Sequence, residues 1–158
     1  MNKLKLQILA SLLAGLALTG CDEALASAAG EARAEETLLD RELDPAQVVR
    51  GKALYEKYCL EGHGAGGKGQ LGDWRIRDAE GPFPPPPMDD SPRAWHHPTA
   101  VLLEMIREGS PQAQGKMPAW KGKLSEQDQQ DVVAYIKSLW SGPVYQLWSK
   151  MERQSLES

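Results

Sequence analysis

The chain has 158 residues, of which 41% are hydrophobic and 25% are charged, with 15 glycines and 11 prolines. This length fits one ordinary domain with appendages, and the composition excludes a chain that is disordered throughout or collagen-like. The net charge of −4, from 18 basic and 22 acidic residues, argues against nucleic acid as a partner, because phosphate binding needs a clustered basic surface.

Residues 1–20 have the features of a signal peptide. Two lysines precede an apolar stretch at 6–18, which is too short for an ordinary membrane span. The sequence LTGC at 18–21 resembles the lipobox of bacterial lipoproteins, in which the cysteine, here Cys21, is lipidated and becomes the mature N-terminus. The alternative is a plain secretory signal with an unmodified cysteine. By the same resemblance, Asp22 favours a lipid anchor in the bilayer of the inner membrane, with the chain on its periplasmic face.

An acidic segment without aromatic residues follows the predicted anchor. Residues 22–44 carry eight acidic and two basic residues and few large apolar ones. Together with Cys21 they are predicted to form a flexible, solvated tether, residues 21–44. Because Cys21 is taken by the lipid, Cys59 is the one cysteine left, and no intramolecular disulfide is possible.

Three helices are predicted within residues 45–140. The first begins with Asp44 as its N-cap and Pro45 at its first position. The second begins at Pro98 and ends at Gly109. The third begins at Ser125, with Asp128 three residues further on. Gly51 inside the first helix indicates that another backbone approaches closely there. The tail at 141–158 can add one short amphipathic helix. No alternating strand pattern occurs, so the fold class is all-α.

A long irregular region at 63–97 separates the first two helices. It is rich in glycine and holds a proline run at 82–87 that Phe83 interrupts, which excludes a buried helix or a central strand. A loop of this length in a small domain is unusual unless it wraps around something. Short helices joined by such loops enclose little core, which indicates a bound cofactor.

Cys59 and His63 lie four residues apart, where the first predicted helix ends. This spacing places both on one face of a helical turn, so that one planar ligand can contact both. The sequence CLEGH at 59–63 resembles the haem attachment motif of class I c-type cytochromes, in which two cysteines form thioethers and the histidine is the proximal iron ligand. The similarity is ordered along about residues 45–140. It includes GKALY at 51–55, GAGGKG at 64–69, PM at 87–88, HHP at 96–98, IREG at 106–109, MPAW at 117–120 and VAYI at 133–136.

The resemblance implies a cytochrome c-like fold of three to four short helices, with long loops wrapped around a haem. It also implies that Cys59 forms a thioether, that His63 is the proximal ligand and that Met117 is the distal one. Met88 and Met105 are the competing candidates for the distal position. A further implication is that a backbone carbonyl at 84–87 accepts from the other nitrogen of His63. Where the terminal helices cross, Gly51 and Tyr55 are expected to pack against Tyr135.

Gly62 departs from the family pattern, because it occupies the place of the second thioether cysteine. One vinyl group is therefore left without a bond. The possible outcomes are a haem c attached by one thioether, a haem held without a covalent bond, and a haem-free domain that keeps the fold. We expect the single thioether.

His96 and His97 are expected to have surface and helix-capping roles. The alternative is a copper site formed by one of them with Cys59, His63 and Met117, since thiolate, imidazole and thioether suit that metal. Four lysines near the presumed ligand loops can be ordinary solvated side chains or can steer an acidic partner. They are Lys68, Lys116, Lys121 and Lys123.

The function expected from this resemblance is a periplasmic electron carrier with haem c and a lipid anchor. It passes single electrons between membrane redox complexes, or to and from another periplasmic carrier. An iron with both axial positions filled offers no substrate site, so we do not expect an enzyme. The alternative function is that of a haem-free or copper-binding lipoprotein with the same fold.

Overall fold

The structure is a computed structural model that describes residues 19–70, 72–77, 81–111 and 115–157. The chain divides into two compact units, and the boundary lies between Asp40 and Arg41. The apolar stretch of the predicted signal peptide lies outside the described residues.

The first unit contains helix α1, Thr19–Asp40. This helix covers most of residues 21–44, the segment predicted as a flexible tether. Its sequence is rich in alanine, glutamate and leucine, which have high intrinsic helix propensity, and it has no proline. Residues 26–35 are exposed, as expected for a solvated segment.

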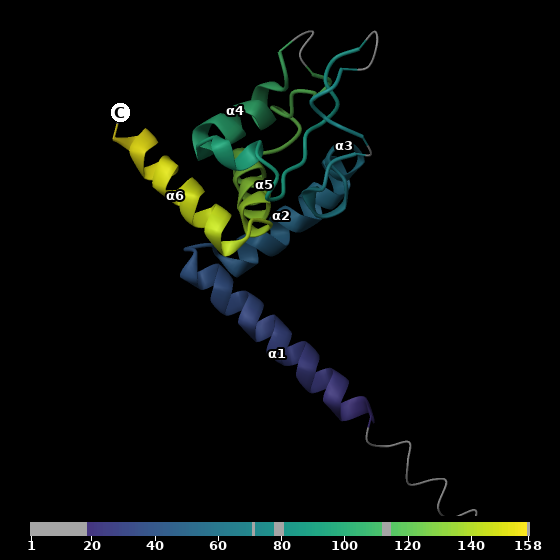
Figure 1. Ribbon diagram of the computed structural model, residues 1–158, viewed down its shortest axis with the longest axis vertical. Coiled ribbons are helices and arrows are strands. Elements are labelled where there is room, and N and C mark those ends of the chain that lie inside the picture. The colour runs from purple at the N-terminus through teal and green to yellow at the C-terminus, as the bar shows by residue number, and fades with distance from the viewer. Residues whose placement is uncertain (1–18, 71, 78–80, 112–114, 158) are drawn as a thin grey trace, which may run out of the picture. The chain divides into compact units, whose positions relative to one another are not determined.

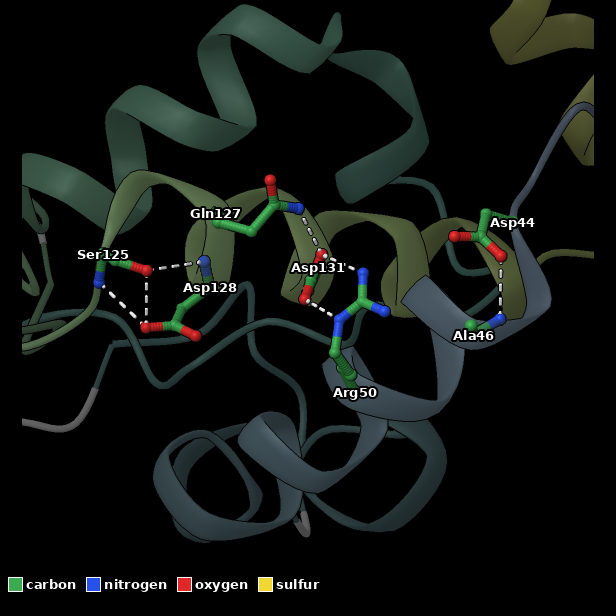
Figure 2. A network of polar contacts seen from close by, with 7 residues as sticks. All are labelled: Asp44, Ala46, Arg50, Ser125, Gln127, Asp128 and Asp131. Carbon is green, nitrogen blue, oxygen red and sulfur yellow. Dashed lines mark hydrogen bonds and ion pairs between the residues drawn. The ribbon is translucent and has the colours of Figure 1, made fainter.

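Helices α2, Pro45–Tyr58, and α5, Glu126–Ser138, form the centre of the second unit (Figure 1). Both begin as the sequence predicted. The Asp44 side chain accepts from the amide of Ala46 at 2.9 Å, and Ser125 forms a capping box with Asp128 (Figure 2). These caps satisfy amides that a helix start would otherwise leave unpaired.

The backbones of α2 and α5 come close together at Gly51. A Cβ atom there would lie 1.8 Å from the carbonyl oxygen of Asp131, so only glycine allows this approach. One turn away, the rings of Tyr55 and Tyr135 pack with centroids 5.1 Å apart. The expected packing of Gly51 and Tyr55 against Tyr135 is therefore confirmed.

An ion pair beside this crossing joins α2 to α5. Asp131 is 2% exposed and accepts from Nε of Arg50 at 2.7 Å and from Nη2 at 3.3 Å. Gln127 donates to the same carboxylate at 2.8 Å (Figure 2). Burial acts to raise the pKa of Asp131, but hydrogen bonds from Arg50, Gln127 and Gln47 hold it below its ordinary value.

Helix α4, Thr99–Glu108, packs against α5 and contributes Ile106 to the core. It begins after Pro98 and ends at Gly109, as predicted. Gly109 has φ +76°, a left-handed conformation that glycine adopts without strain. The core is formed mainly by apolar side chains of α2, α4, α5 and the last helix, α6, Gly142–Leu156. Its buried members are Tyr55, Ala94, Ile106, Val132, Val133, Tyr135, Ile136, Trp140 and Trp148.

Helix α6, Gly142–Leu156, is the helix that the sequence predicted as a short piece in the tail, and it spans 15 residues. Trp148 is buried and its ring packs against those of Trp140 and Tyr145, with centroids 5.5 and 5.2 Å away. Its Nε1 donates to the carbonyl of His97 at 3.2 Å. Glu152 accepts from the amide of Thr99 at 2.7 Å and so satisfies the first turn of α4. The tail is therefore part of the folded unit.

Hydrogen bonds join the first residue of the second unit to the region where α5 is followed by α6. The guanidinium of Arg41 donates to the carbonyl of Trp140 at 2.6 Å, and the hydroxyl of Tyr145 donates to the carbonyl of Arg41. Leu43, two residues further on, is buried.

The long region between α2 and α4 is irregular, as predicted. It contains the short helix α3, Leu60–His63, and two 3-10 turns, η1 at Ala65–Gly67 and η2 at Ala94–His96. Across the described residues there is no strand beyond one bridge between Lys121 and Leu124. The all-α fold class is thus confirmed.

Candidate functional site

Cys59 and His63 lie on one helical turn. Helix α2 ends at Tyr58, and the amide of Cys59 donates to the carbonyl of Tyr55 at 2.8 Å. Helix α3 continues the chain, and the amide of His63 donates to the carbonyl of Cys59 at 2.9 Å. This bond from residue i+4 to residue i places both side chains on the same face, as their spacing predicted.

The imidazole of His63 is 9% exposed, and its Nδ1 lies 2.8 Å from the carbonyl oxygen of Pro86. A carbonyl only accepts, so Nδ1 carries the hydrogen and Nε2 keeps its lone pair. Burial lowers the pKa of His63, although the bond to Pro86 acts to raise it, and the ring is therefore held neutral. A neutral ring with a fixed tautomer is the form that ligates a metal through Nε2.

The proline loop is held in place from both sides. The amide of Met88 donates to the carbonyl of Gly67 at 2.6 Å, and Nε1 of Trp140 donates to the carbonyl of Met88 at 2.9 Å. The prolines themselves have no N–H, so they add no competing donor beside His63. The prediction that a carbonyl of residues 84–87 accepts from His63 is confirmed, and the residue is Pro86.

The thiol of Cys59 is half-buried and packs against the core. Loss of solvent raises its pKa to about 11, so the sulfur stays protonated at neutral pH. A thioether sulfur is neutral, so these apolar surroundings suit the product of haem attachment.

Gly62 lies between these two residues on α3. A Cβ atom at this position would meet only the side chain of Pro85, at 3.7 and 3.9 Å, which is ordinary van der Waals contact. Packing therefore does not require glycine here. The fold therefore gives no steric reason, at the level of Cβ, for glycine in place of a second cysteine.

Met117 is half-buried and packs against the core. Its amide donates to Oγ of Ser110 at 3.0 Å, and its carbonyl accepts from the amide of Ser110 at 3.0 Å. Of its two competitors, Met105 is 39% exposed on α4, whereas Met88 also packs against the core. Exposure makes Met105 the poorest candidate for a buried ligand. Ser110 was not among the predicted site residues.

The remaining histidines serve the packing of η2. The ring of His96 lies against that of Trp95, with centroids 3.9 Å apart, and the carbonyl of His97 accepts from Trp148. Burial, with nearby Arg93 and His96, lowers the pKa of His97. Within the described part of the chain, no three His, Cys, Asp or Glu side chains are gathered as a metal site requires. The copper alternative, which joined Cys59 and His63 to one of these histidines, is therefore not supported.

Two of the four lysines considered as steering charges have partners on the surface. Lys121 forms an ion pair with Glu108 at 2.7 Å, and Nζ of Lys123 lies 5.5 Å from the centroid of the Trp120 ring. Lys68 and Lys116 are exposed. These contacts are those of ordinary surface lysines.

A helix able to span a membrane is not found among the described residues, because none is both long and apolar enough. Cys21 belongs to α1, but its side chain lies outside what the structure describes.

Comparison with known proteins gives one match. The family model for cytochrome c oxidase, cbb3-type, subunit III matches residues 46–136, more than half of the chain and all of the segment from α2 to α5 except its outermost residues. No curated protein and no solved structure matches.

Proposed function

The chain belongs to the family of cytochrome c oxidase, cbb3-type, subunit III, and on this premise we propose that it is a lipid-anchored periplasmic electron carrier with haem c. Membership of this family makes residues 46–136 a cytochrome c domain. Such a domain binds haem covalently and carries electrons, which fits a carrier and not an enzyme. The ligands, the anchor and the partners given below are proposed for this chain.

The observation that carries the proposal is the state of His63. Its ring is buried, its Nδ1 is tied to Pro86, and Nε2 is left as the nitrogen that can ligate iron. Cys59, one helical turn earlier, brings a protonated sulfur to the same face, where a thioether to the porphyrin can form.

When bound, haem c supplies a one-electron couple between ferrous and ferric iron. Cys59 keeps the group on the chain through a carbon–sulfur bond. His63 ligates through Nε2, and the Pro86 carbonyl fixes its orientation. Met117 is the proposed second ligand, and a neutral sulfur there favours ferrous iron and leaves no position open for a substrate.

The proposed attachment is a single thioether, because Gly62 stands where a second cysteine would be. The other vinyl group then stays intact. The competing outcome is a haem-free domain with the same fold.

We further propose that Cys21 carries the lipid and that the domain works at the periplasmic face of the inner membrane. The pattern at residues 18–21 and the apolar stretch before it support this placement. Its partners would be membrane redox complexes or another periplasmic carrier. A tethered carrier meets such partners at raised effective concentration.

The absorption spectrum of the purified chain tests the proposal. We expect a Soret band that shifts on reduction, and haem that stays with the polypeptide after denaturation in acidic organic solvent. A chain without a Soret band would contradict the electron carrier and leave the haem-free alternative. Haem that is extracted freely would contradict the thioether bond but would leave haem binding itself intact.

A further inference from the structure

Ser110 forms three hydrogen bonds with Met117. The amide of Ser110 donates to the carbonyl of Met117 at 3.0 Å, and the amide of Met117 donates to Oγ of Ser110 at 3.0 Å. The Ser110 hydroxyl also donates to the Met117 carbonyl at 3.4 Å. Both main-chain polar groups of Met117 are thus bound by one residue seven positions away.

The surroundings of this pair restrict it further. At Gly109 a Cβ atom would lie 2.6 Å from the Met117 carbonyl oxygen, and at Gly115 it would lie 2.7 Å from Oγ of Ser110. The amide of Trp120 donates to the carbonyl of Ile106 at 3.1 Å, which ties the far side of the segment to the end of α4. The backbone around Met117 is therefore held close to a helix that contributes to the core.

Because Met117 lies outside any helix, packing of a regular element cannot fix its main chain. We propose that Ser110 is a positioning residue, which fixes the backbone of Met117 so that its sulfur is held for the iron. This inference rests on the proposed function. The main-chain amide of Ser110 makes one of the three hydrogen bonds to Met117, and the hydroxyl makes the other two. The hydroxyl therefore determines how firmly the loop is held.

The test uses the full chain loaded with haem and the variant Ser110→Ala, which removes the hydroxyl and keeps the amide. We expect a weaker sulfur-to-iron charge-transfer absorption in the ferric protein. We also expect imidazole, which competes with Met117 for the iron, to bind about tenfold more tightly, since two hydrogen bonds that favour the bound loop are lost. Ser110→Thr keeps a hydroxyl and should restore both readouts.

The matched control is Ser138→Ala. Ser138 also donates from a half-buried hydroxyl to a main-chain carbonyl, that of Tyr135 at 2.6 Å, but it lies on α5. We expect this variant to leave the absorption and the imidazole affinity unchanged. An equal effect of both substitutions would overturn the proposal, because it would reflect general loss of stability. If Ser110→Ala does not fold, Ser110→Cys, with its weaker hydrogen-bonding group, takes its place with the same expectation.

Met117→Ala separates this inference from the proposed function. If Met117→Ala abolishes the charge-transfer absorption and Ser110→Ala changes neither readout, the ligand is right and the role of Ser110 is wrong. If the absorption survives in Met117→Ala, the ligand assignment is wrong, and the positioning role falls with it.

Discussion

Gly62 is the residue that prevents a second thioether to haem in this chain. The structure gives no steric reason for a glycine at this position. A Cβ atom there would touch only Pro85, at ordinary van der Waals distance. We therefore predict that Gly62→Cys folds and raises the yield of covalently bound haem, because its thiol can add to the second vinyl group. Loss of that vinyl group shifts the reduced alkaline pyridine spectrum of the haem to shorter wavelength.

Gly62→Ser is the control for this substitution. Serine has nearly the size of cysteine but forms no thioether. A rise in haem yield with serine would show that the effect comes from filling space beside Pro85, and it would contradict the explanation by attachment.

Asp131 should make the stability of the domain depend on acid pH. Its pKa is lowered in the folded state, so the ionised form stabilises the fold at pH values above its ordinary pKa of 3.8. This contribution is lost as the pH falls through the lower pKa of the folded state. We predict that Asp131→Asn is less stable than the natural chain at pH 7 and that the difference narrows below about pH 4.

Urea unfolding of both chains at pH 7 and pH 3 measures this difference. Arg50 Nε and Gln127 donate to different oxygens of Asp131, and asparagine keeps only one acceptor oxygen, so one of these hydrogen bonds is lost at both pH values. The change of the difference with pH therefore reports on the charge. A difference that does not change with pH would show that the ionisation of Asp131 does not contribute.

Much of the site was predictable at the scale of residues. The spacing of Cys59 and His63 predicted their common face, and the family resemblance implied that a carbonyl of residues 84–87 accepts from the ring. Ser110 was not predictable, because a hydroxyl that bonds the main chain of a distant residue leaves no periodic pattern. The only available signal was its position directly after Gly109, where a helix ends and the chain turns.

Among the helices, capping residues predicted the boundaries of α2, α4 and α5 well, since Asp44, Gly109 and Ser125 each have a clear local role. The helical conformation of α1 was not predicted. Its charge and lack of aromatic residues indicated disorder, whereas its alanine and glutamate content favours a helix. The length of α6 was also underestimated, because the contacts of Trp148 are with residues distant in the sequence, such as His97 and Lys137.

Trp148 should therefore account for much of the attachment of α6. It is 5% exposed, and Nζ of Lys137 lies 4.2 Å from its ring centroid. We predict that Trp148→Ala lowers the free energy of unfolding by about 3–5 kcal/mol, the usual cost of a cavity left by a large aromatic side chain. Denaturant unfolding followed by circular dichroism measures the change.

The neighbouring Leu147 provides the control. It is 57% exposed, and Leu147→Ala should change the free energy of unfolding by less than about 0.5 kcal/mol. Comparable losses in the two variants would contradict the view that Trp148 attaches the helix through burial.

For the molecule as a whole, the net charge of −4 is distributed unevenly. Residues 1–21 contribute two positive charges, residues 22–44 contribute eight negative and two positive charges, and residues 45–158 contribute 14 of each sign. The acidity belongs to α1 and the residues that follow it, while the remainder is balanced. Any charge that guides a partner to the cytochrome domain is therefore local.

Cys21→Ser tests the anchor of the whole protein. Serine cannot be lipidated through a thioether, so we predict that the variant is lost from the membrane fraction while its absorption spectrum is unchanged. Fractionation of cells that express either chain, followed by mass spectrometry of the N-terminus, measures this. Retention of the serine variant in the membrane, with an unmodified N-terminus in the natural chain, would contradict a lipid anchor.

The bonds that join Arg41 to Trp140 and Tyr145 have a consequence for the order of folding. They connect positions 99 and 104 residues apart, so they can form only after nearly the whole chain is available. Contacts between such distant residues require closure of a long loop, which slows the step in which they form. Helix α2 can therefore present Cys59 on an unfinished fold, and the time before the ends of the domain meet is the period in which its sulfur is most accessible to a modifying enzyme.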